Sequence, residues 1–186
     1  WPTPPTFVLL VGDTGQVPYF TGTTGTNGCD LYYACMDEGD DWHPDLYVGR
    51  FSCDSEADVT LLATKSTKYV RFALSSTAED WADEATFMAS SDNYTVSEGT
   101  HNYAIDNWVQ PAGYDVINKR YSVTYNATTQ QCIDDINNGI SMLTYSGHGS
   151  TNGWADGPPM TATQVQALTN VDMLPMVQSY ACITGS

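Results

Sequence analysis

SMLTYSGHGSTNGW (residues 141–154) and MLPMVQSYACITGS (residues 173–186) share the feature that decides the fold. In each stretch, a run of strand-forming residues stops abruptly at a chemically reactive residue. The first run stops at His148, which lies between two glycines, and the second stops at Cys182. Residues 161–170, between the two runs, have the pattern of a short helix with a threonine cap. A right-handed strand–helix–strand connection then places the two strands side by side or nearly so.

His148 and Cys182 are therefore expected at one edge of a sheet, where the carboxyl ends of parallel strands bind ligands. A thiol becomes a good nucleophile at neutral pH when a nearby base assists it, and an imidazole is such a base. Gly149 lets a substrate backbone approach closely, and its N–H together with the N–H of Cys182 could form an oxyanion hole. The spacing alone leaves a plainer interpretation open, namely a polar loop histidine and a core thiol.

The rest of the chain alternates between apolar runs and helical patterns. We expect strands at residues 7–13, 45–51 and 84–92, and helices at residues 55–73, 98–110 and 128–139. Ser55 is a good N-cap for the first of these helices, and Gly139 closes the last. The runs FVLLV and SMLTY are apolar on both faces, as in strands that are covered on both sides. This order predicts an α/β fold with a mostly parallel sheet.

The composition limits the class of protein. The 186 residues are enough for one domain with a sizeable core, and 41% of them are apolar. The formal charge of −16, from 22 acidic and 6 basic residues, argues against nucleic acid and anionic membranes as partners. It suits an extracellular or saline setting, or a cationic substrate. No apolar run reaches about 18 residues, so we expect no membrane-spanning helix.

Two local features leave alternatives open. Cys29 and Cys35 flank the sequence DLYYA and would either form a disulfide in an oxidising compartment or be two small buried thiols. Residues 37–45, DEGDDWHPD, would either bind a structural calcium through their carboxylates or form a solvated acidic loop. No Cys-x-x-Cys pair or His-x-x-x-His spacing supports a zinc site.

Four sequence blocks, in the same order, resemble the gingipain family of cysteine peptidases. YSGHGSTNGW and LTNVDMLPMVQSYACITG are similar to its catalytic core, and FVLLVGD and YVGRFSCDSEAD are similar to two further blocks. The resemblance implies a caspase-like α/β fold, a three-layer sandwich with a mostly parallel sheet and helices on both faces. It also implies that a Cys-His dyad hydrolyses peptide bonds through a thioester. Cys182 would be the nucleophile, and His148 the general base and acid.

The same resemblance implies further site residues. MASSD matches a strand-end motif whose acid orients the histidine, which gives this role to Asp92; the plainer interpretation is an aspartate that caps the turn. Glu98, in VSEGTHN, lies near the place of an acid that binds a basic substrate side chain, which implies cleavage after Arg or Lys. The plainer interpretation of Glu98 is a residue in the first turn of a helix. Trp154 is also assigned to substrate binding.

The resemblance has consequences for setting and boundaries. Protein or peptide substrates, a secreted or cell-surface location in bacteria, and no redox or organic cofactor are expected. No signal peptide is visible, residues 1–6 have the character of a linker, and the sequence stops four residues after Cys182. We therefore expect residues 7–186 to form part of a caspase-like peptidase domain that is truncated at both ends.

Two other functions stay open at this point. Some relatives of the family act as sortase-like transpeptidases of a secretion system, which pass the acyl group to an amine in place of water. A non-catalytic module that retains the fold is the second alternative, and the intact His148, Gly149 and Cys182 argue against it. The sequence does not reveal the natural substrate or the oligomeric state.

Overall fold

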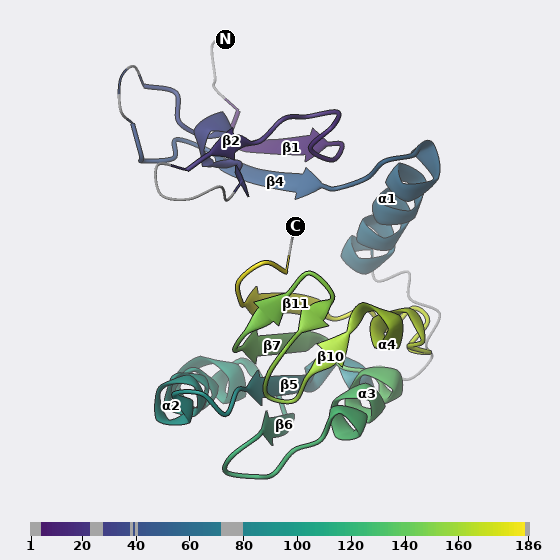
Figure 1. Ribbon diagram of the computed structural model, residues 1–186. Coiled ribbons are helices and arrows are strands. Elements are labelled where there is room, and N and C mark those ends of the chain that lie inside the picture. Colours follow the sequence, from purple (N-terminus) through teal and green to yellow (C-terminus); the bar gives the residue numbers. More distant parts are fainter. Residues whose placement is uncertain (1–4, 23–27, 38, 40, 72–79, 185–186) are drawn as a thin grey trace. The chain divides into compact units, whose positions relative to one another are not determined.

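The computed structural model describes residues 5–22, 28–37, 39, 41–71 and 80–184. The chain divides into two compact units, Trp1–Phe72 and Ala73–Ser186, and each unit has its own β-structure. Figure 1 labels the main elements along the chain. Among the described residues, no helix is long and apolar enough to span a membrane.

The first unit contains a parallel pair of strands and one long helix. Its elements are β1 (Phe7–Val11), β2 (Phe20–Thr21), β3 (Gly28–Cys29), the 3-10 helix η1 (Leu31–Tyr33), β4 (Tyr47–Phe51) and α1 (Glu56–Val70). Strand β1 pairs with β4 in parallel, and β2 pairs with β3 antiparallel. Helix α1 has the predicted cap, because Ser55 accepts a hydrogen bond from the backbone N–H of Asp58 at 3.2 Å.

Within the described residues of the first unit, strand β1 is not covered on both faces, so the expectation from its apolar run is not met there. Phe7, Leu9 and Val11 are exposed on one face, and the residues between them are half-buried. The Phe7 ring stacks on Tyr47, its partner across the pair, with 5.1 Å between the ring centroids. An apolar run shows that a strand can be buried, but it does not show what covers it.

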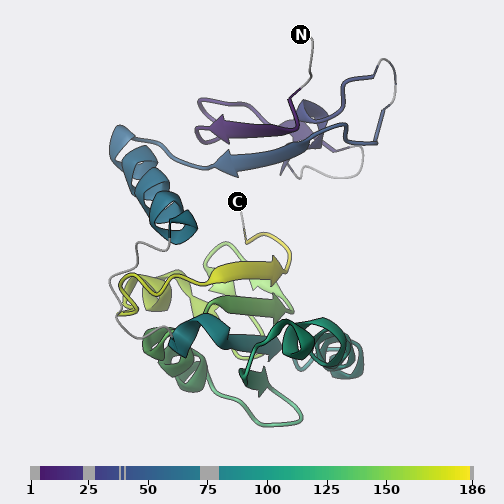
Figure 2. The ribbon, with the colours of Figure 1, turned by 180° about the vertical axis from the view of Figure 1, so that it is seen from behind.

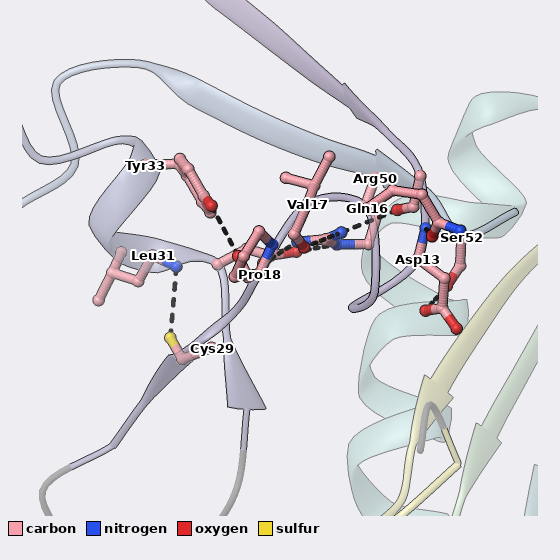
Figure 3. A network of polar contacts seen from close by, with 11 residues as sticks. Asp13, Gln16, Val17, Pro18, Cys29, Leu31, Tyr33, Arg50 and Ser52 are labelled. Atoms are coloured by element: carbon pink, nitrogen blue, oxygen red, sulfur yellow. Dashed lines mark hydrogen bonds and ion pairs between the residues drawn. The ribbon is translucent and has the colours of Figure 1, made fainter. Parts of the chain in front are cut away.

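Arg50 organises the loops of the first unit (Figure 3). Its guanidinium makes two bonds to the carboxylate of Asp30, at 2.7 and 2.6 Å, and donates to the carbonyls of Gly12 and Val17 at 2.8 and 2.9 Å. The bond from Arg50 lowers the pKa of Asp30. The hydroxyl of Tyr33 in η1 donates to the carbonyl of Pro18, in the loop after β1, at 2.6 Å. One cation thus ties the turn after β1 to the start of η1.

Cys29 and Cys35 are separate thiols in this structure. The backbone N–H of Leu31 donates to the Cys29 sulfur at 3.3 Å, and the Cys35 thiol donates to the Leu31 carbonyl at 3.5 Å. Of the two interpretations of this pair, the structure therefore has the one without a disulfide.

The second unit is built on four parallel strands in the order β11-β7-β5-β6. Its elements are η2 (Asp80–Asp83), β5 (Glu84–Ala89), α2 (Tyr94–Ala104), the π-helical turn η3 (Ile105–Val109), η4 (Gln110–Ala112), β6 (Val116–Tyr121), α3 (Thr129–Asn138), β7 (Met142–Ser146), β8 (Gly149–Ser150), β9 (Gly153–Trp154), β10 (Met160–Thr161), α4 (Ala162–Gln166) and β11 (Met176–Tyr180). Strands β8, β9 and β10 form a small antiparallel sheet.

Both faces of the four-stranded sheet are covered. Met88 of β5 belongs to a core cluster with Cys132 and Ile136 of α3. The preceding residue, Phe87, belongs to a second cluster with Ile105, where α2 passes into η3. Successive strand residues point to opposite faces, so the two clusters lie on opposite sides of the sheet. Figures 1 and 2 show α3 and α4 on one side of the strands and α2 on the other, which confirms the predicted three-layer α/β fold.

Helix α3 is attached to the sheet through a largely buried ion pair. The guanidinium of Arg120 in β6 makes bonds of 2.7 and 2.6 Å to the carboxylate of Asp135, which also accepts from the hydroxyl of Thr86 at 3.2 Å. The helix begins at a capping box, in which Thr128 and Gln131 bond each other's backbone N–H. These contacts set the position of α3 between β6 and β7.

Helix α2 begins at Tyr94, four residues before the predicted start at residue 98. Its N-cap, Asn93, has a left-handed backbone with φ of 47°, a conformation that asparagine tolerates better than most residues. The first turn contains no acidic residue and two β-branched ones, Thr95 and Val96, so its helical tendency is weak. Glu98 therefore lies in the second turn of α2, not in the first.

Candidate active site

Three neighbouring strands end at the same level. Ser146 closes β7 and pairs with Tyr180, the last residue of β11. The N–H of Ser90, just beyond β5, donates to the carbonyl of Ser146 at 3.0 Å, and the N–H of Gly147 donates to the carbonyl of Tyr180 at 3.2 Å. The strands that precede the histidine and the cysteine are therefore neighbours, as predicted.

Each of the three candidate catalytic residues comes two positions after the residue at which its strand reaches this common level. Asp92, His148 and Cys182 come two residues after Ser90, Ser146 and Tyr180, respectively. The carboxyl ends of parallel strands form one edge of a sheet. The structure therefore brings all three residues to the same edge of the four-stranded sheet.

His148 and Asp92 are in direct contact. Nε2 of His148 lies 2.9 Å from Oδ2 of Asp92. The two side chains are 61% and 68% exposed, so solvent screens the pair, and the contact orients the ring more than it stabilises the fold. The hydroxyl of Ser90 donates to the backbone carbonyl of Asp92 at 3.0 Å and supports the turn that carries the carboxylate.

Gly149 lies directly against the Cys182 segment. A Cβ atom at residue 149 would fall 2.0 Å from the carbonyl oxygen of Cys182 and 2.6 Å from Cγ2 of Thr184. Residue 149 must therefore lack a side chain because the backbone of Cys182 lies against it. The sequence analysis gave a different reason, namely the close approach of a substrate backbone. The two residues whose N–H groups are predicted to form an oxyanion hole are neighbours in space, and that role stays a prediction.

Cys182 is exposed and begins the turn formed by residues 182–184. Its neighbour Ile183 has φ of 60°, a left-handed conformation that is rare for a β-branched side chain and is often found where a site holds strain. Within the residues that the structure describes, no hydrogen bond joins the thiol of Cys182 to His148. In enzymes without substrate, hydrogen bonds between catalytic groups are often long or poorly aligned and form fully only when substrate binds.

Trp154 is the last residue of β9, which follows His148 in the chain, and it is half-buried. Its ring stacks on Tyr145, with 4.4 Å between centroids and 11° between planes. Its indole N–H donates to the hydroxyl of Ser179 in β11 at 2.9 Å. These contacts place Trp154 between the strand of the histidine and the strand of the cysteine, and its role in substrate binding stays a prediction.

Tyr145 is a residue of this site that sequence reasoning missed. It is fully buried in β7, and the single proton of its hydroxyl is shared between the carbonyls of His148 and Asp156. Tyr145 lies inside an apolar run, and such a run predicts a core residue without a further task. The available signal was the hydroxyl, because a buried tyrosine O–H usually has a partner.

Glu98 has partners that the substrate-binding role does not foresee. It is 6% exposed, and its carboxylate accepts bonds from the backbone N–H of Thr124 at 3.3 Å and from the Thr124 hydroxyl. A substrate cation would therefore have to reach a carboxylate that is nearly buried and already accepts two hydrogen bonds. Among the described residues, no hydrogen bond or ion pair joins Glu98 to Asp92 or His148.

His101, three residues further along α2, also lies beneath the site. It is 3% exposed, and Nε2 lies 2.8 Å from the hydroxyl of Ser146 at the end of β7. Burial lowers the pKa of His101 to about 4. The ring is therefore neutral near pH 7 and acts as a polar support for the strand end before His148.

The acidic stretch at residues 37–45 is only partly described, since residues 38 and 40 lie outside the described residues. In the described part, Asp45 accepts from the N–H of Met36 at 2.7 Å, and Asp41 accepts from the N–H of His43 at 2.9 Å. No group of three or more His, Cys, Asp or Glu side chains that could hold a metal ion occurs among the described residues. A structural calcium stays a prediction.

With this geometry in place, a comparison with protein families decides the assignment. The model of "Peptidase family C25" matches residues 1–186. The chain belongs to peptidase family C25. This confirms the predicted resemblance, because the curated relatives of this C25 chain include gingipains.

Gingipain R2 of Porphyromonas gingivalis is 33% identical to this C25 chain over 97% of its length, and Lys-gingipain of the same organism is 30% identical over 97%. A solved structure described as a protease superposes with a TM-score of 0.85 at 28% identity, covering 97% of this chain and 39% of the other. The crystal structure of the Arg-specific cysteine proteinase gingipain R superposes with a TM-score of 0.75 at 32% identity, covering 97% and 41%.

The C25 chain spans 24% of the length of gingipain R2 and 10% of that of Lys-gingipain. The likeness therefore concerns one part of these relatives. A peptidase acts on proteins or peptides, and these relatives are bacterial. The finer assignments, which are the dyad and the preferred residue at the cleavage site, are matters for proposal.

Proposed function

We propose that the complete protein is a cysteine endopeptidase in which Cys182 is the nucleophile, His148 the general base and acid, and Asp92 the group that orients His148. The observation that carries the proposal is the contact of 2.9 Å between Asp92 and His148. It joins the ends of β5 and β7, and Cys182 follows β11, the neighbour of β7 on its other side. Membership of peptidase family C25 supports the same reaction.

The reaction needs only these groups and water. His148 takes the thiol proton as the sulfur of Cys182 attacks the carbonyl carbon of the scissile bond. The N–H groups of Gly149 and Cys182 stabilise the negative oxygen of the tetrahedral intermediate. The C–N bond breaks as His148 gives its proton to the leaving amine, and a thioester remains. His148 then deprotonates water, which attacks the thioester, releases the acid and restores the thiol, while Asp92 holds the imidazole in place.

A basic residue before the scissile bond is the preference that we propose. The relatives described as Arg-specific and as Lys-gingipain support it. The formal charge of −16 also raises the rate of encounter with cationic peptides. Glu98 is bonded to Thr124 in this structure, so we rest the basic preference on the relatives and the charge, and a role for Glu98 in it stays a prediction.

We further propose that the protein acts outside the cytoplasm of a bacterium, secreted or at the cell surface, and that catalysis uses no redox or organic cofactor. The bacterial relatives support the first statement. The self-sufficient acid–base and nucleophilic set of Asp92, His148 and Cys182 supports the second.

The proposal is tested by treating the complete protein with a peptidyl chloromethyl ketone that ends in arginine or lysine. We expect one adduct per chain, located on Cys182 by mass spectrometry. Cys182→Ala should abolish labelling and peptide hydrolysis, and His148→Ala should slow both. Cys35→Ala is the matched control, because Cys35 is a half-buried thiol of the first unit, and it should label normally. A complete, folded protein that neither labels nor cleaves peptides would reject the peptidase function.

The same assay separates hydrolysis from transfer. With an amine acceptor present, an endopeptidase gives mainly the free acid, whereas a transpeptidase gives the new amide. Product analysis by mass spectrometry with and without the amine distinguishes the two, and the amide as the main product would replace hydrolysis with transpeptidation.

A further inference from the structure

We propose that Tyr145 is a positioning residue for the peptidase reaction, which holds the His148 turn against Asp92 and Cys182 through its buried hydroxyl. This inference rests on the proposed function, because it assigns Tyr145 a task in the same site. Tyr145 does not touch the reacting atoms, and it acts through the backbone on both sides of its hydroxyl.

The hydroxyl of Tyr145 joins the two ends of the loop that carries His148. Its oxygen lies 2.8 Å from the carbonyl oxygen of His148 and close to that of Asp156, and its single proton is shared between the two acceptors. The carbonyl of His148 also accepts from the N–H of Ala155 at 2.8 Å. The first and last residues of the loop 148–156 are therefore held together, and we call this point the neck of the loop. The hydroxyl of the buried Tyr145 lies at the neck.

The first branch from Tyr145 leads to the cysteine strand. The ring stacks on Trp154 at 4.4 Å between centroids, and the indole N–H of Trp154 bonds to the Ser179 hydroxyl at 2.9 Å. Ser179 lies in β11, three residues before Cys182. A displacement of Tyr145 would therefore also displace β11, the strand that precedes Cys182.

The second branch leads to the orienting acid. The hydroxyl of Ser91 lies 3.1 Å from both carboxylate oxygens of Asp156, and Ser91 precedes Asp92. Gly157 allows this approach, because a Cβ atom there would fall 2.1 Å from Cα of Ser90. The loop held by Tyr145 is thus packed against the strand end that carries Asp92.

The hydroxyl suits this task physically. Burial raises the pKa of Tyr145 to about 12, so the group stays protonated and can donate at neutral pH. Among the described residues, no other group donates to the Asp156 carbonyl. Tyr145→Phe would keep the stacking on Trp154 but leave that carbonyl without a donor, and the neck of the loop would loosen.

Tyr121 provides a matched control. It is also a buried tyrosine, 1% exposed, and its hydroxyl bonds to the side chain of Asn102 at 3.1 Å. It lies in β6, at the other end of the sheet order from β11. Tyr121→Phe therefore removes one buried hydroxyl from the same unit without touching the His148 loop.

The experiment measures kcat and KM of the complete protein and of both variants with one peptide substrate, per titrated Cys182. We expect Tyr145→Phe to lower kcat by about tenfold with KM changed by less than about twofold, because misplacement of a catalytic group affects the chemical step. Tyr121→Phe should keep both constants. The rate of Cys182 labelling should fall in Tyr145→Phe only.

Equal kcat values for Tyr145→Phe and Tyr121→Phe would overturn the positioning role, as would a change in KM alone. If Tyr145→Phe gives no soluble protein, Trp154→Phe is measured in its place, since it removes the bond to Ser179, and an unchanged kcat there would overturn the link from Tyr145 to the cysteine strand. A parent protein without thiol-dependent cleavage would instead reject the proposed function, so the two failures are distinguishable.

Discussion

Nε2 of His148 lies 2.9 Å from Oδ2 of Asp92, across the ends of two adjacent parallel strands. An ionised carboxylate can only accept hydrogen bonds, so this contact favours the proton on Nε2. Nδ1 then carries the lone pair, and in the proposed reaction it is the atom that takes the thiol proton of Cys182. Nitrogen-15 chemical shifts of His148 in the complete protein should report the Nε2–H tautomer, and the Nδ1–H tautomer would contradict this assignment.

Replacing Asp92 by Asn should reduce turnover. The amide keeps the size of the side chain but removes the negative charge that stabilises the imidazolium. We expect kcat to fall by about 10- to 100-fold, at the low end of effects on general acid–base catalysis because the pair is exposed. Steady-state kinetics on the complete protein provide the check. Asp115→Asn, which changes an exposed acid just before β6, is the control, and equal kinetics of the two variants would return Asp92 to a turn-capping role.

The arrangement of the strand ends could be predicted from the sequence. The right-handed connection rule limits how two parallel strands joined by a helix can lie, and both reactive residues follow strands directly. The helix caps at Ser55 and Thr161 were equally visible, because the serine or threonine side chain bonds to the next turn whatever the tertiary fold. These features depend on local chemistry and chain order alone.

Other features could not be read from the sequence. Partners of a buried polar group depend on tertiary contacts, which is why the bonds of Tyr145 and His101 were missed. The start of α2 was placed too late because its cap, Asn93, has a left-handed backbone that residue type alone does not reveal. This error moved Glu98 to the first turn of the predicted helix. The exposure of β1 was missed because an apolar run does not identify what packs on it.

Gly149→Ala should disable the nucleophile without unfolding the protein. The added Cβ would meet the Cys182 carbonyl oxygen at 2.0 Å, so the Cys182 turn must move. A displacement near 1 Å at a catalytic group costs on the order of 100-fold in rate. We expect the rate of Cys182 labelling to fall by at least about that factor, while the far-UV circular dichroism spectrum stays the same.

Gly99→Ala is the control for that experiment. Gly99 lies within α2, and a Cβ there meets nothing within 4 Å. Alanine is the better helix former, so this variant should be more stable by about 0.5–1 kcal/mol and should label normally. Normal labelling of Gly149→Ala would show that the Cys182 turn does not depend on this close approach.

His101 should make the protein less stable in mild acid. Its pKa is lowered to about 4 in the fold, against about 6.5 in an unfolded chain. Above pH 6.5 the residue is neutral in both states and has no effect. As the pH falls from 6.5 to 4, only the unfolded chain takes up the proton, so the free energy of unfolding drops by up to about 3 kcal/mol, and below pH 4 the loss is complete.

Denaturant unfolding of the complete protein and of His101→Gln at pH 7, 6, 5 and 4.5 checks this effect. The difference in unfolding free energy between the two proteins should shift in favour of His101→Gln as the pH falls. His43→Gln, which changes an exposed histidine of the first unit, is the control. A difference between parent and His101→Gln that is constant with pH would contradict a neutral, buried His101.

Glu98→Gln separates the two roles considered for this carboxylate. If Glu98 bound the substrate cation, losing its charge would remove one partner of a buried pair, at a cost of roughly 3 to 5 kcal/mol, and cleavage after Arg or Lys would fall by a factor on the order of 100 or more. In the structure, however, Glu98 is 6% exposed and holds the N–H and hydroxyl of Thr124. We therefore expect Glu98→Gln and Thr124→Val to lower the melting temperature alike. Substrate profiling should then show an unchanged ratio of cleavage after basic and neutral residues in both variants. A selective loss of cleavage after Arg or Lys in Glu98→Gln, absent from Thr124→Val, would instead establish Glu98 as the specificity residue.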